Sequence, residues 1–180
     1  GVSAHLGESY LHDLDQFDVV FRSPGVKYLE PGIQAAIAKG VDVTSSTAYF
    51  LDQRPCKVVG VTGTKGKGTT CTLIHEMLKA SGMDSHVAGN IGDPAISLLN
   101  ITDADSVVVL ELSSFQLQDM KASPDFAVLL NTTEDHLDYH ADKDEYMRAK
   151  EALLAHQKSE DVAVLNKDYE YVKFYEPVVK

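Results

Sequence analysis

Residues 57–70 combine a short β-branched run with a glycine-rich turn, and this combination limits the possible folds more than any other segment. The run KVVGVT at 57–62 is typical of a strand, and residues 70–81 are compatible with a helix. The turn between them consists of Gly63, Thr64, Lys65, Gly66, Lys67, Gly68, Thr69 and Thr70. A strand, a glycine-rich loop and a helix N-terminus in this order surround phosphate oxygens with backbone N–H groups. We therefore expect the turn to bind a nucleoside triphosphate, with an ordinary tight turn as the alternative.

The residue after Lys67 differs from the usual phosphate-loop pattern. The stretch from Gly60 to Lys67 reads G-V-T-G-T-K-G-K, one residue longer than GxxxxGK if Gly60 is counted as the first glycine, and Gly68 stands where serine or threonine normally supplies a hydroxyl to Mg²⁺. Thr69 is the nearest hydroxyl and becomes the candidate Mg²⁺ ligand. Lys67 is the candidate for contacting the β- and γ-phosphates, because its positive charge is the loop's natural phosphate partner.

The composition excludes several classes of function. The chain has 180 residues, is 44% hydrophobic and carries a net charge of −11, so it can bury a core but does not attract nucleic acid. Cys56 and Cys71 follow no disulfide or metal pattern, which predicts free thiols in a reducing compartment. The chain shows neither an apolar run of about 18 residues nor a signal peptide. These features predict a cytoplasmic protein without membrane insertion.

Strand-like and helix-like segments alternate along the chain, which predicts the α/β class. The runs VVVL and AVLL are apolar on both faces, as in central parallel strands covered by helices. We expect a doubly wound, mostly parallel sheet with ligands at the carboxyl ends of its strands. The expected strands are residues 2–6, 18–21, 41–43, 57–62, 85–88, 106–112, 126–130 and 162–165. The expected helices are residues 31–39, 45–52, 70–81, 94–100, 114–120 and 143–156.

Two short polar clusters follow predicted strands, at the edge where an open parallel sheet binds ligands. In the first, Gly89-Asn90-Ile91-Gly92, the glycines permit close backbone approach and Asn90 offers an amide, although the pattern alone favours a plain turn. In the second, Glu111 lies near the end of the run SVVVLEL, where a buried carboxylate is costly unless it is paired, so we expect it to bind Mg²⁺. A structural carboxylate that caps the next helix is the alternative, although Ser113 or Ser114 could equally serve as the cap.

A third cluster, NTTEDHLDYH at residues 131–140, crowds acids and imidazoles after the run FAVLL. This crowding indicates metal or proton chemistry, with a solvated loop and helix cap as the alternative. Imidazole generally suits Zn²⁺ better than Mg²⁺, so residue chemistry alone does not select His136 as a Mg²⁺ ligand. From the residue pattern alone, Lys150 is expected to be an exposed helix lysine.

Five motifs in order resemble the Mur ligases of peptidoglycan synthesis: G-T-x-G-K, G-N-I-G, E-L-S-S-F-Q-L, N-x-T-E-D-H-L-D and Y-M-R-A-K. ELSSFQL with TEDHLD most resembles the branch that joins D-glutamate to UDP-N-acetylmuramoyl-L-alanine. FDVVFRSPGV resembles the first domain of that branch. The GKG spelling at 66–68 also resembles folylpolyglutamate synthase, a relative with the same ATP domain. A nucleotide-binding fragment without catalysis is the alternative from a different class.

The resemblance implies a role for particular residues. Lys67, His136 and Lys150 would be catalytic, with Lys67 on the β- and γ-phosphates of ATP. Two Mg²⁺ ions would be held, with Thr69, Glu111, His136 and Lys150 as the implied ligands. Lys150 would be carbamylated, which converts a cation into an oxygen donor. Ser23, Asn90 and His136 would contact the UDP-sugar substrate.

The resemblance also implies how the chain is divided. Residues 1–54 would be the C-terminal part of a Rossmann-like, UDP-substrate-binding domain. Residues 55–180 would be the N-terminal part of a P-loop-type central ATP-binding domain, with the junction at Arg54-Pro55-Cys56. Such a chain would begin and end within domains and would be inactive by itself. The complete reaction would pass through an acyl phosphate and release ADP and phosphate.

Overall fold

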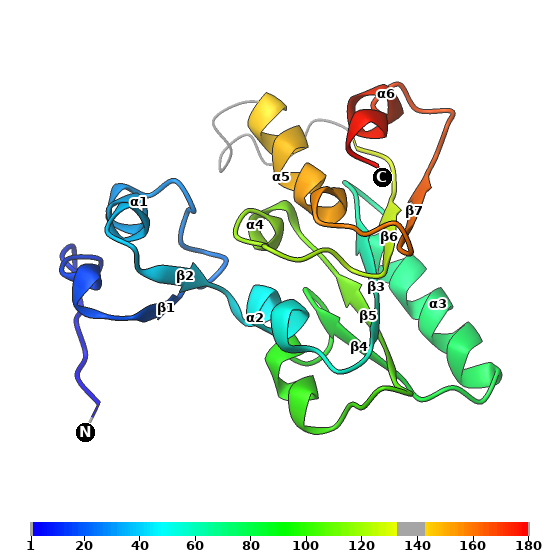
Figure 1. Cartoon of the computed structure of the whole chain (residues 1–180), viewed down its shortest axis with the longest axis horizontal. Helices are drawn as coiled ribbons and strands as arrows, with labels where there is room; N and C mark the ends of the chain where they lie inside the picture. The colour runs from blue at the N-terminus through cyan, green and yellow to red at the C-terminus, as the bar shows by residue number, and fades with distance from the viewer. Residues whose placement is uncertain (1, 133–142, 180) are drawn as a thin grey trace.

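The computed structural model describes residues 2–132 and 143–179, and within these ranges the strands form two sheets (Figure 1). A two-stranded sheet, β1-β2, lies toward the N-terminus, and a five-stranded sheet has the order β4-β5-β3-β6-β7. Neighbouring strands are parallel in both sheets. The strands are β1 (Val19–Phe21), β2 (Asp42–Thr44), β3 (Lys57–Thr62), β4 (Ser85–Gly89), β5 (Val107–Glu111), β6 (Phe126–Leu129) and β7 (Val162–Leu165).

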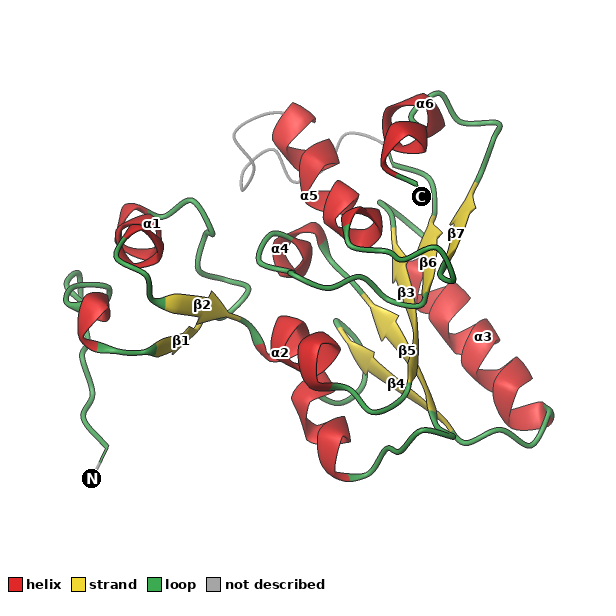
Figure 2. Cartoon of the chain, in the orientation of Figure 1, coloured by secondary structure: helices red, strands yellow, loops and turns green. Residues whose placement is uncertain are grey.

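Helices cover both faces of the five-stranded sheet, which gives three layers (Figure 2). Helix α3 packs on one face, whereas α2, α4 and α5 pack on the other. The α-helices are α1 (Pro31–Ala38), α2 (Ser46–Gln53), α3 (Lys67–Ala80), α4 (Ser114–Leu117), α5 (Lys143–Ala155) and α6 (Val172–Tyr175). Three short 3₁₀ segments in the described ranges are η1 (Leu14–Gln16), η2 (Ala95–Asn100) and η3 (Glu176–Val178).

The central strands are buried on both faces because apolar residues occupy successive positions. Val59 of β3 and Val109 of β5 pack with Cys71 of α3 on one face. Val108 and Leu110 of β5 point to the opposite face, into the core shared with α2, α4 and α5. This two-sided burial confirms the α/β class and the parallel sheet expected from the continuous apolar runs.

Strand β3 lies in the centre of the sheet, where the order of the strands reverses. The chain leaves β3 toward β4 on one side and later places β6 on the other side of β3. A reversal of this kind separates the connecting loops and opens a crevice at the carboxyl ends of the strands. The turn that follows β3 therefore lies where a ligand is expected.

Three predicted elements are wrong in existence, type or length. Residues 2–6 form no strand, and Val2 is 102% exposed, so no partner buries them. Residues predicted as a helix at 94–100 form the 3₁₀ segment η2, with Ser97 N donating to Pro94 O across 3.0 Å. The helix predicted at 114–120 ends at Leu117, because the following residues turn so that Asp119 reaches a buried arginine, Arg22.

The residues before position 54 divide between two cores. Ile33 and Ala36 of α1 pack with Val43 of β2 in a small core of the two-stranded sheet. Helix α2 instead buries Phe50 and Leu51 in the core of the five-stranded sheet. The domain division at residue 54 stays a prediction.

Gly89 allows β4 to end close against β5. Its φ is +105°, and a Cβ at this position would lie 2.2 Å from the carbonyl oxygen of Glu111. Asn90 N donates to the same oxygen across 2.9 Å, so the backbone turn is fixed at the end of both strands. A side chain at residue 89 would therefore force Asn90 and Glu111 apart.

Gly89→Ala should destabilise the chain more than Gly40→Ala. Gly40 has a similar φ of +89°, but a Cβ added there would meet nothing within 4 Å, so it isolates the cost of the left-handed backbone. That cost is about 1–2 kcal/mol for both variants, and the overpacking at residue 89 should add about 1–3 kcal/mol. Urea unfolding measures both; equal losses would show that the β4–β5 junction relaxes freely.

Candidate functional site

The glycine-rich turn forms a tight loop between β3 and α3. Gly66 has a φ of +85° and precedes the helix, so α3 begins at Lys67, three residues earlier than predicted. Thr64 N donates to Asn131 O across 2.8 Å, and a Cβ at Gly63 would lie 2.7 Å from Cβ of Leu130. The loop is therefore packed against the residues that follow β6, and its backbone is held in place.

Lys67 lies folded over this loop. Its Nζ donates to Gly63 O across 3.0 Å and to Thr64 O across 3.2 Å. The ammonium group thus sits at the positive end of α3, where helix dipole and lysine charge both favour an anion. Lys65 and Thr69 are exposed, so both side chains are open to a bound ligand.

Glu111 ends β5 beside the loop. Its residue is 5% exposed, and its Oε1 accepts a hydrogen bond of 3.1 Å from Nδ2 of Asn90. A Cβ at Gly68 would lie 3.0 Å from Oε2 of the same carboxylate. The structure therefore brings Asn90, Glu111 and the phosphate loop together, as their positions after three strands suggested.

The proximity of Glu111 gives a physical reason for glycine at position 68. A larger residue would press on the carboxylate, because the space beside the α-carbon is already filled. A hydroxyl is absent from position 68, while a carboxylate oxygen lies beside it. The hydroxyl that is missing at position 68 is thus accompanied by a carboxylate oxygen of Glu111, from β5, at the same place. The local sequence could not reveal this neighbour.

Cys71 lies one turn of α3 beyond Lys67 and is fully buried. Burial and the negative charge of Glu111 raise the pKa of its thiol to about 12, although Lys67 opposes the shift. The thiol is therefore protonated at neutral pH and is a poor nucleophile. Its contribution is packing between α3 and the sheet.

Lys150 is 1% exposed, so the expectation of an exposed helix lysine from the residue pattern is wrong. Its Nζ lies 3.5 Å from Oγ1 of Thr62, at the end of β3, and 4.4 Å from the centroid of the Tyr146 ring. Tyr146 OH in turn lies 3.1 Å from Oγ1 of Thr64 in the phosphate loop. Helix α5 thus brings a buried cation to the loop.

Tyr146, the first residue of the motif Y-M-R-A-K, is a site residue to which the sequence analysis assigned no role. It stands four residues before Lys150, and side chains with this spacing share a helix face. That spacing is the signal that could have found it. The ring covers the lysine ammonium, and its hydroxyl connects α5 to the loop.

Ser23 is a predicted site residue that the structure does not join to this group. Ser23 is exposed in a turn after β1, where its carbonyl accepts a hydrogen bond of 3.0 Å from Val26 N. His136 lies outside the described residues. Within residues 2–132 and 143–179, no three His, Cys, Asp or Glu side chains are grouped as metal ligands would be.

The sequence from residue 61 to residue 179 matches the Mur ligase middle domain. This match starts inside β3 and includes the phosphate loop, Glu111 and Lys150. The chain belongs to the Mur ligase family. Membership confirms the resemblance drawn from the five motifs.

Two sequence relatives carry the name UDP-N-acetylmuramoylalanine–D-glutamate ligase. The protein of Clostridium kluyveri is 44% identical over 165 residues, which are 92% of this chain and 36% of that protein. The protein of Clostridium botulinum, strain Loch Maree, is 44% identical over 168 residues, which are 93% of this chain and 37% of that protein. The chain therefore spans just over a third of the length of these curated relatives.

Solved structures of Mur ligases share the fold. The UDP-N-acetylmuramate:L-alanyl-gamma-D-glutamyl-meso-diaminopimelate ligase from Neisseria meningitides superposes with a TM-score of 0.59 at 21% identity, covering 92% of this chain and 57% of that one. MurF from Acinetobacter baumannii superposes with a TM-score of 0.57 at 16% identity, covering 89% of this chain and 42% of that one. At these sequence identities the two structures support a shared fold only.

None of the helices in the described ranges has the length and apolarity needed to cross a membrane.

Lys67→Ala should weaken ATP binding, and Lys79→Ala is the matched control. Lys67 lies over the loop at the N-terminus of α3, whereas Lys79 is exposed in the last turn of the same helix. Loss of a charge-assisted phosphate contact costs about 1.5–3 kcal/mol, roughly 10- to 150-fold in affinity. Isothermal titration calorimetry on chains with unchanged circular dichroism measures this loss. Unchanged affinity of Lys67→Ala would contradict the role of the loop lysine.

Proposed function

We propose that this chain is the ATP-binding part of a ligase that joins D-glutamate to UDP-N-acetylmuramoyl-L-alanine. The observation that carries this proposal is 44% identity over 92% of the chain to a ligase of that name. The grouping of Lys67, Glu111 and Lys150 around the phosphate loop supports it. The substrates would be small molecules, and the protein would act in the cytoplasm.

The residues around the loop fit ATP with Mg²⁺. Backbone N–H groups at the start of α3 and the Lys67 ammonium would hold the phosphates. Glu111 supplies a hard oxygen beside Gly68, and Thr69 adds an exposed hydroxyl in the first turn of the helix. When bound, two Mg²⁺ ions would supply charge neutralisation for phosphoryl transfer. Carboxylate and hydroxyl oxygens are the donors that Mg²⁺ prefers.

Lys150 and His136 would complete this site. Lys150 is already buried at the carboxyl end of β3, beside Thr62. Carbamylation there would replace a buried positive charge by a negative group with oxygen donors for Mg²⁺. His136 would be a further ligand and would contact the substrate, with Asn90 and Ser23 on the UDP-sugar.

The reaction would transfer the γ-phosphoryl group of ATP to the alanyl carboxylate. A carboxylate oxygen attacks the γ-phosphorus, and ADP leaves. The amine of D-glutamate then attacks the acyl carbon, loses a proton and displaces phosphate, which forms the amide. Lys67 would stabilise negative charge on the phosphoryl oxygens during the first step. The rest of the contribution would be alignment of the two reactants.

A second candidate is a ligase of the folylpolyglutamate synthase type, and Gly68 is the observation that favours it. Glycine after the loop lysine gives the GKG spelling of that relative, and here it makes room for Glu111. The two candidates differ in the acid substrate. Turnover with UDP-N-acetylmuramoyl-L-alanine or with a folate, each with its amino acid, separates them.

Glu111→Gln should lower the Mg²⁺-dependent activity of the full-length enzyme that contains this chain. The amide keeps the size and one oxygen of the carboxylate but removes the charge that attracts the ion. Glu76→Gln is the control, because Glu76 is exposed on α3. The measurement is phosphate release against Mg²⁺ concentration. A Glu111→Gln enzyme with the wild-type dependence would assign Glu111 a purely structural role.

The 180-residue chain by itself should show only background turnover. It spans 36% of the length of its relative, and in the proposed function residues outside this span would help to align the substrates. Alignment of reactants contributes about 7–11 kcal/mol to such reactions. The assay compares phosphate release by the chain and by the full-length enzyme, with ATP, UDP-N-acetylmuramoyl-L-alanine and D-glutamate. D-Glutamate-dependent release at equal rates would mean that these residues hold a complete site.

A further inference from the structure

Arg22 is a buried arginine that connects the two sheets. Its side chain is 0% exposed, and its Nε and Nη2 both donate to Oδ2 of Asp119, across 3.1 and 2.8 Å. The side chain of Asp119 is 1% exposed. Arg22 follows β1, whereas Asp119 follows α4, so a two-pronged ion pair joins segments 97 residues apart.

Arg22 also donates to a backbone carbonyl on each side of the junction. Nη1 donates to Val26 O across 2.6 Å, and Nη2 donates to Phe115 O across 2.8 Å. Val26 closes the turn that begins at Ser23, while Phe115 lies in the motif that begins at Glu111. One guanidinium therefore holds the Ser23 turn, α4 and Asp119 together.

Asp119 is oriented by a second element. Its Oδ1 accepts a hydrogen bond of 3.1 Å from Oγ of Ser45, the residue that also caps α2 by accepting from Ala48 N. Burial raises the pKa of Asp119, although Arg22 and Ser45 oppose the shift. The carboxylate therefore depends on these partners for its charge, and its position is fixed from both sides.

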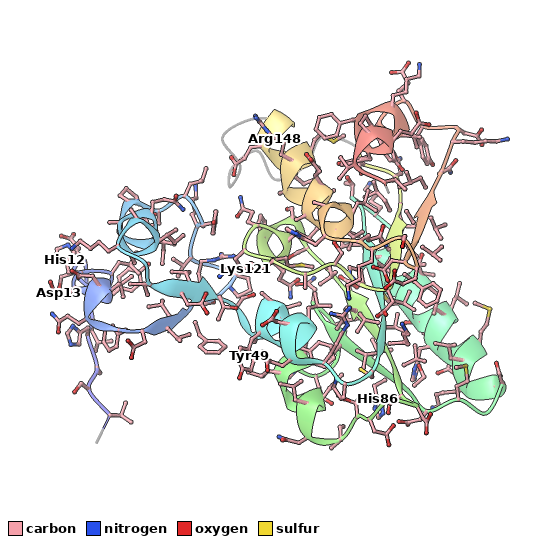
Figure 3. The ribbon with its side chains drawn as sticks, in the orientation of Figure 1. His12, Asp13, Tyr49, His86, Lys121 and Arg148 are labelled. Carbon is pink, nitrogen blue, oxygen red and sulfur yellow. The ribbon has the colours of Figure 1, made fainter. Side chains whose placement is uncertain are left out.

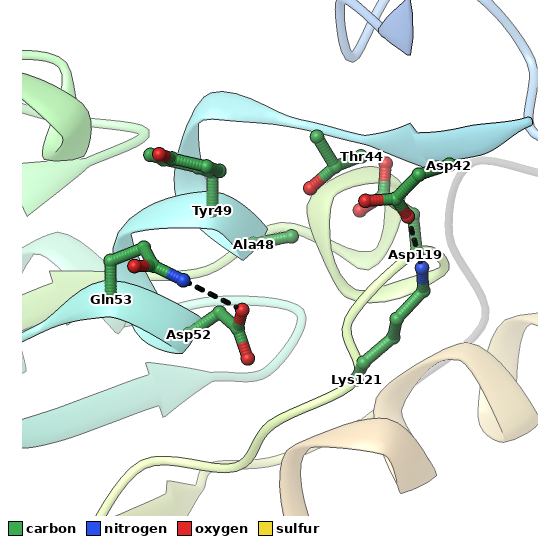
Figure 4. A pocket seen from close by; sticks show the side chains of 8 residues that line it. All are labelled: Asp42, Thr44, Ala48, Tyr49, Asp52, Gln53, Asp119 and Lys121. Carbon is green, nitrogen blue, oxygen red and sulfur yellow. Dashed lines mark hydrogen bonds and ion pairs between the residues drawn. The ribbon is translucent and has the colours of Figure 1, made fainter. Parts of the chain in front are cut away.

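Two cavities beside the buried ion pair have Asp119 among their lining residues. One cavity of about 150 Å³ is lined by Asp42, Tyr49 and Asp119, among others (Figure 4). Another, of about 120 Å³, is lined by Tyr28, Gln118 and Asp119, among others.

Lys121 makes a second contact across the same junction, but at the surface. It lines the same pocket as Tyr49 of α2 (both are labelled in Figure 3), and its Nζ lies 2.5 Å from Oδ1 of Asp42. Both side chains are more than half exposed, at 69% and 55%. Exposed pairs of this kind contribute little to orientation or stability. We therefore expect the buried Arg22–Asp119 pair to contribute more to the orientation of the junction.

We infer that Arg22 is a positioning residue that sets the Ser23 turn relative to the carboxyl edge of the five-stranded sheet. This inference rests on the proposed function, in which Ser23 binds the UDP-sugar and the phosphate loop binds ATP. Neither Arg22 nor Asp119 touches the reacting atoms in this assignment. Their loss would misplace one substrate relative to the other and leave the ATP site intact.

The decisive variant is Arg22→Met with Asp119→Leu. Replacing both partners of a buried ion pair by apolar residues often preserves stability, whereas removing one partner leaves a buried charge. Lys121→Met is the control, because it breaks the exposed pair at the same junction. Arg22→Lys keeps the charge but loses the two-pronged geometry, so it should show an intermediate effect.

The first measurement is steady-state kinetics of the full-length enzyme. The double variant should raise KM for UDP-N-acetylmuramoyl-L-alanine roughly 10- to 100-fold, the scale of a small misplacement of a reactant. KM for ATP should stay within about twofold, and the unfolding midpoint should stay near that of the wild type. Wild-type KM values for both substrates in a folded double variant would overturn the inference.

The second measurement needs no turnover and uses the 180-residue chain. Spin labels at Ala38→Cys on α1 and Lys79→Cys on α3 report the distance between the two sheets; Cys56 and Cys71 are buried. The distance distribution should broaden in the double variant and stay narrow in Lys121→Met. An unchanged distribution would overturn the inference. A wild-type enzyme without D-glutamate-dependent turnover would instead overturn the proposed function, and the distances would still decide the role of Arg22.

Discussion

The parallel pairing of β3 with β5 is the constraint on which the site depends. In this register Val61 lies opposite Glu111, so the phosphate loop and the carboxylate leave the sheet at the same edge. Because β3 is also paired with β6, the loop packs between the ends of two strands. A shift of one residue in the pairing of β3 with β5 would turn Glu111 away from Gly68 and would bury polar groups in the opposite core.

Buried charges occur both beside the phosphate loop and at the junction between the two sheets. Glu111, Lys150 and the Arg22–Asp119 pair are each nearly inaccessible to water. Burying a charge is unfavourable unless hydrogen bonds and opposite charges replace the lost hydration. The fold supplies an amide to Glu111, an aromatic ring to Lys150 and two carbonyls to Arg22. Such unfavourable burial at a strand edge is typical of a functional site rather than of a core built for stability.

Small residues make the close approach possible. Gly63, Gly68 and Gly89 each stand where a Cβ would meet a neighbouring strand or its side chain. Gly63 lies in the loop before α3, Gly68 lies in the first turn of α3, and Gly89 ends β4, but all three converge on the ends of β5 and β6. Their common role is to let backbone come within contact distance of Glu111 and Leu130, which fixes the loop at the edge where a ligand would bind.

The sequence by itself determined the class of fold, the order of the central strands' apolar runs, and the loop that holds Lys67. These features are local: periodicity, glycine spacing and β-branched runs act over a few neighbouring residues. Only the tertiary structure decided that Lys150 is buried, that Gly68 makes room for Glu111, that Tyr146 reaches the loop, and that Arg22 joins the two sheets. Each of these depends on contacts between segments far apart in the chain. A local sequence pattern does not say which side chains such contacts bury or which charges they bring together.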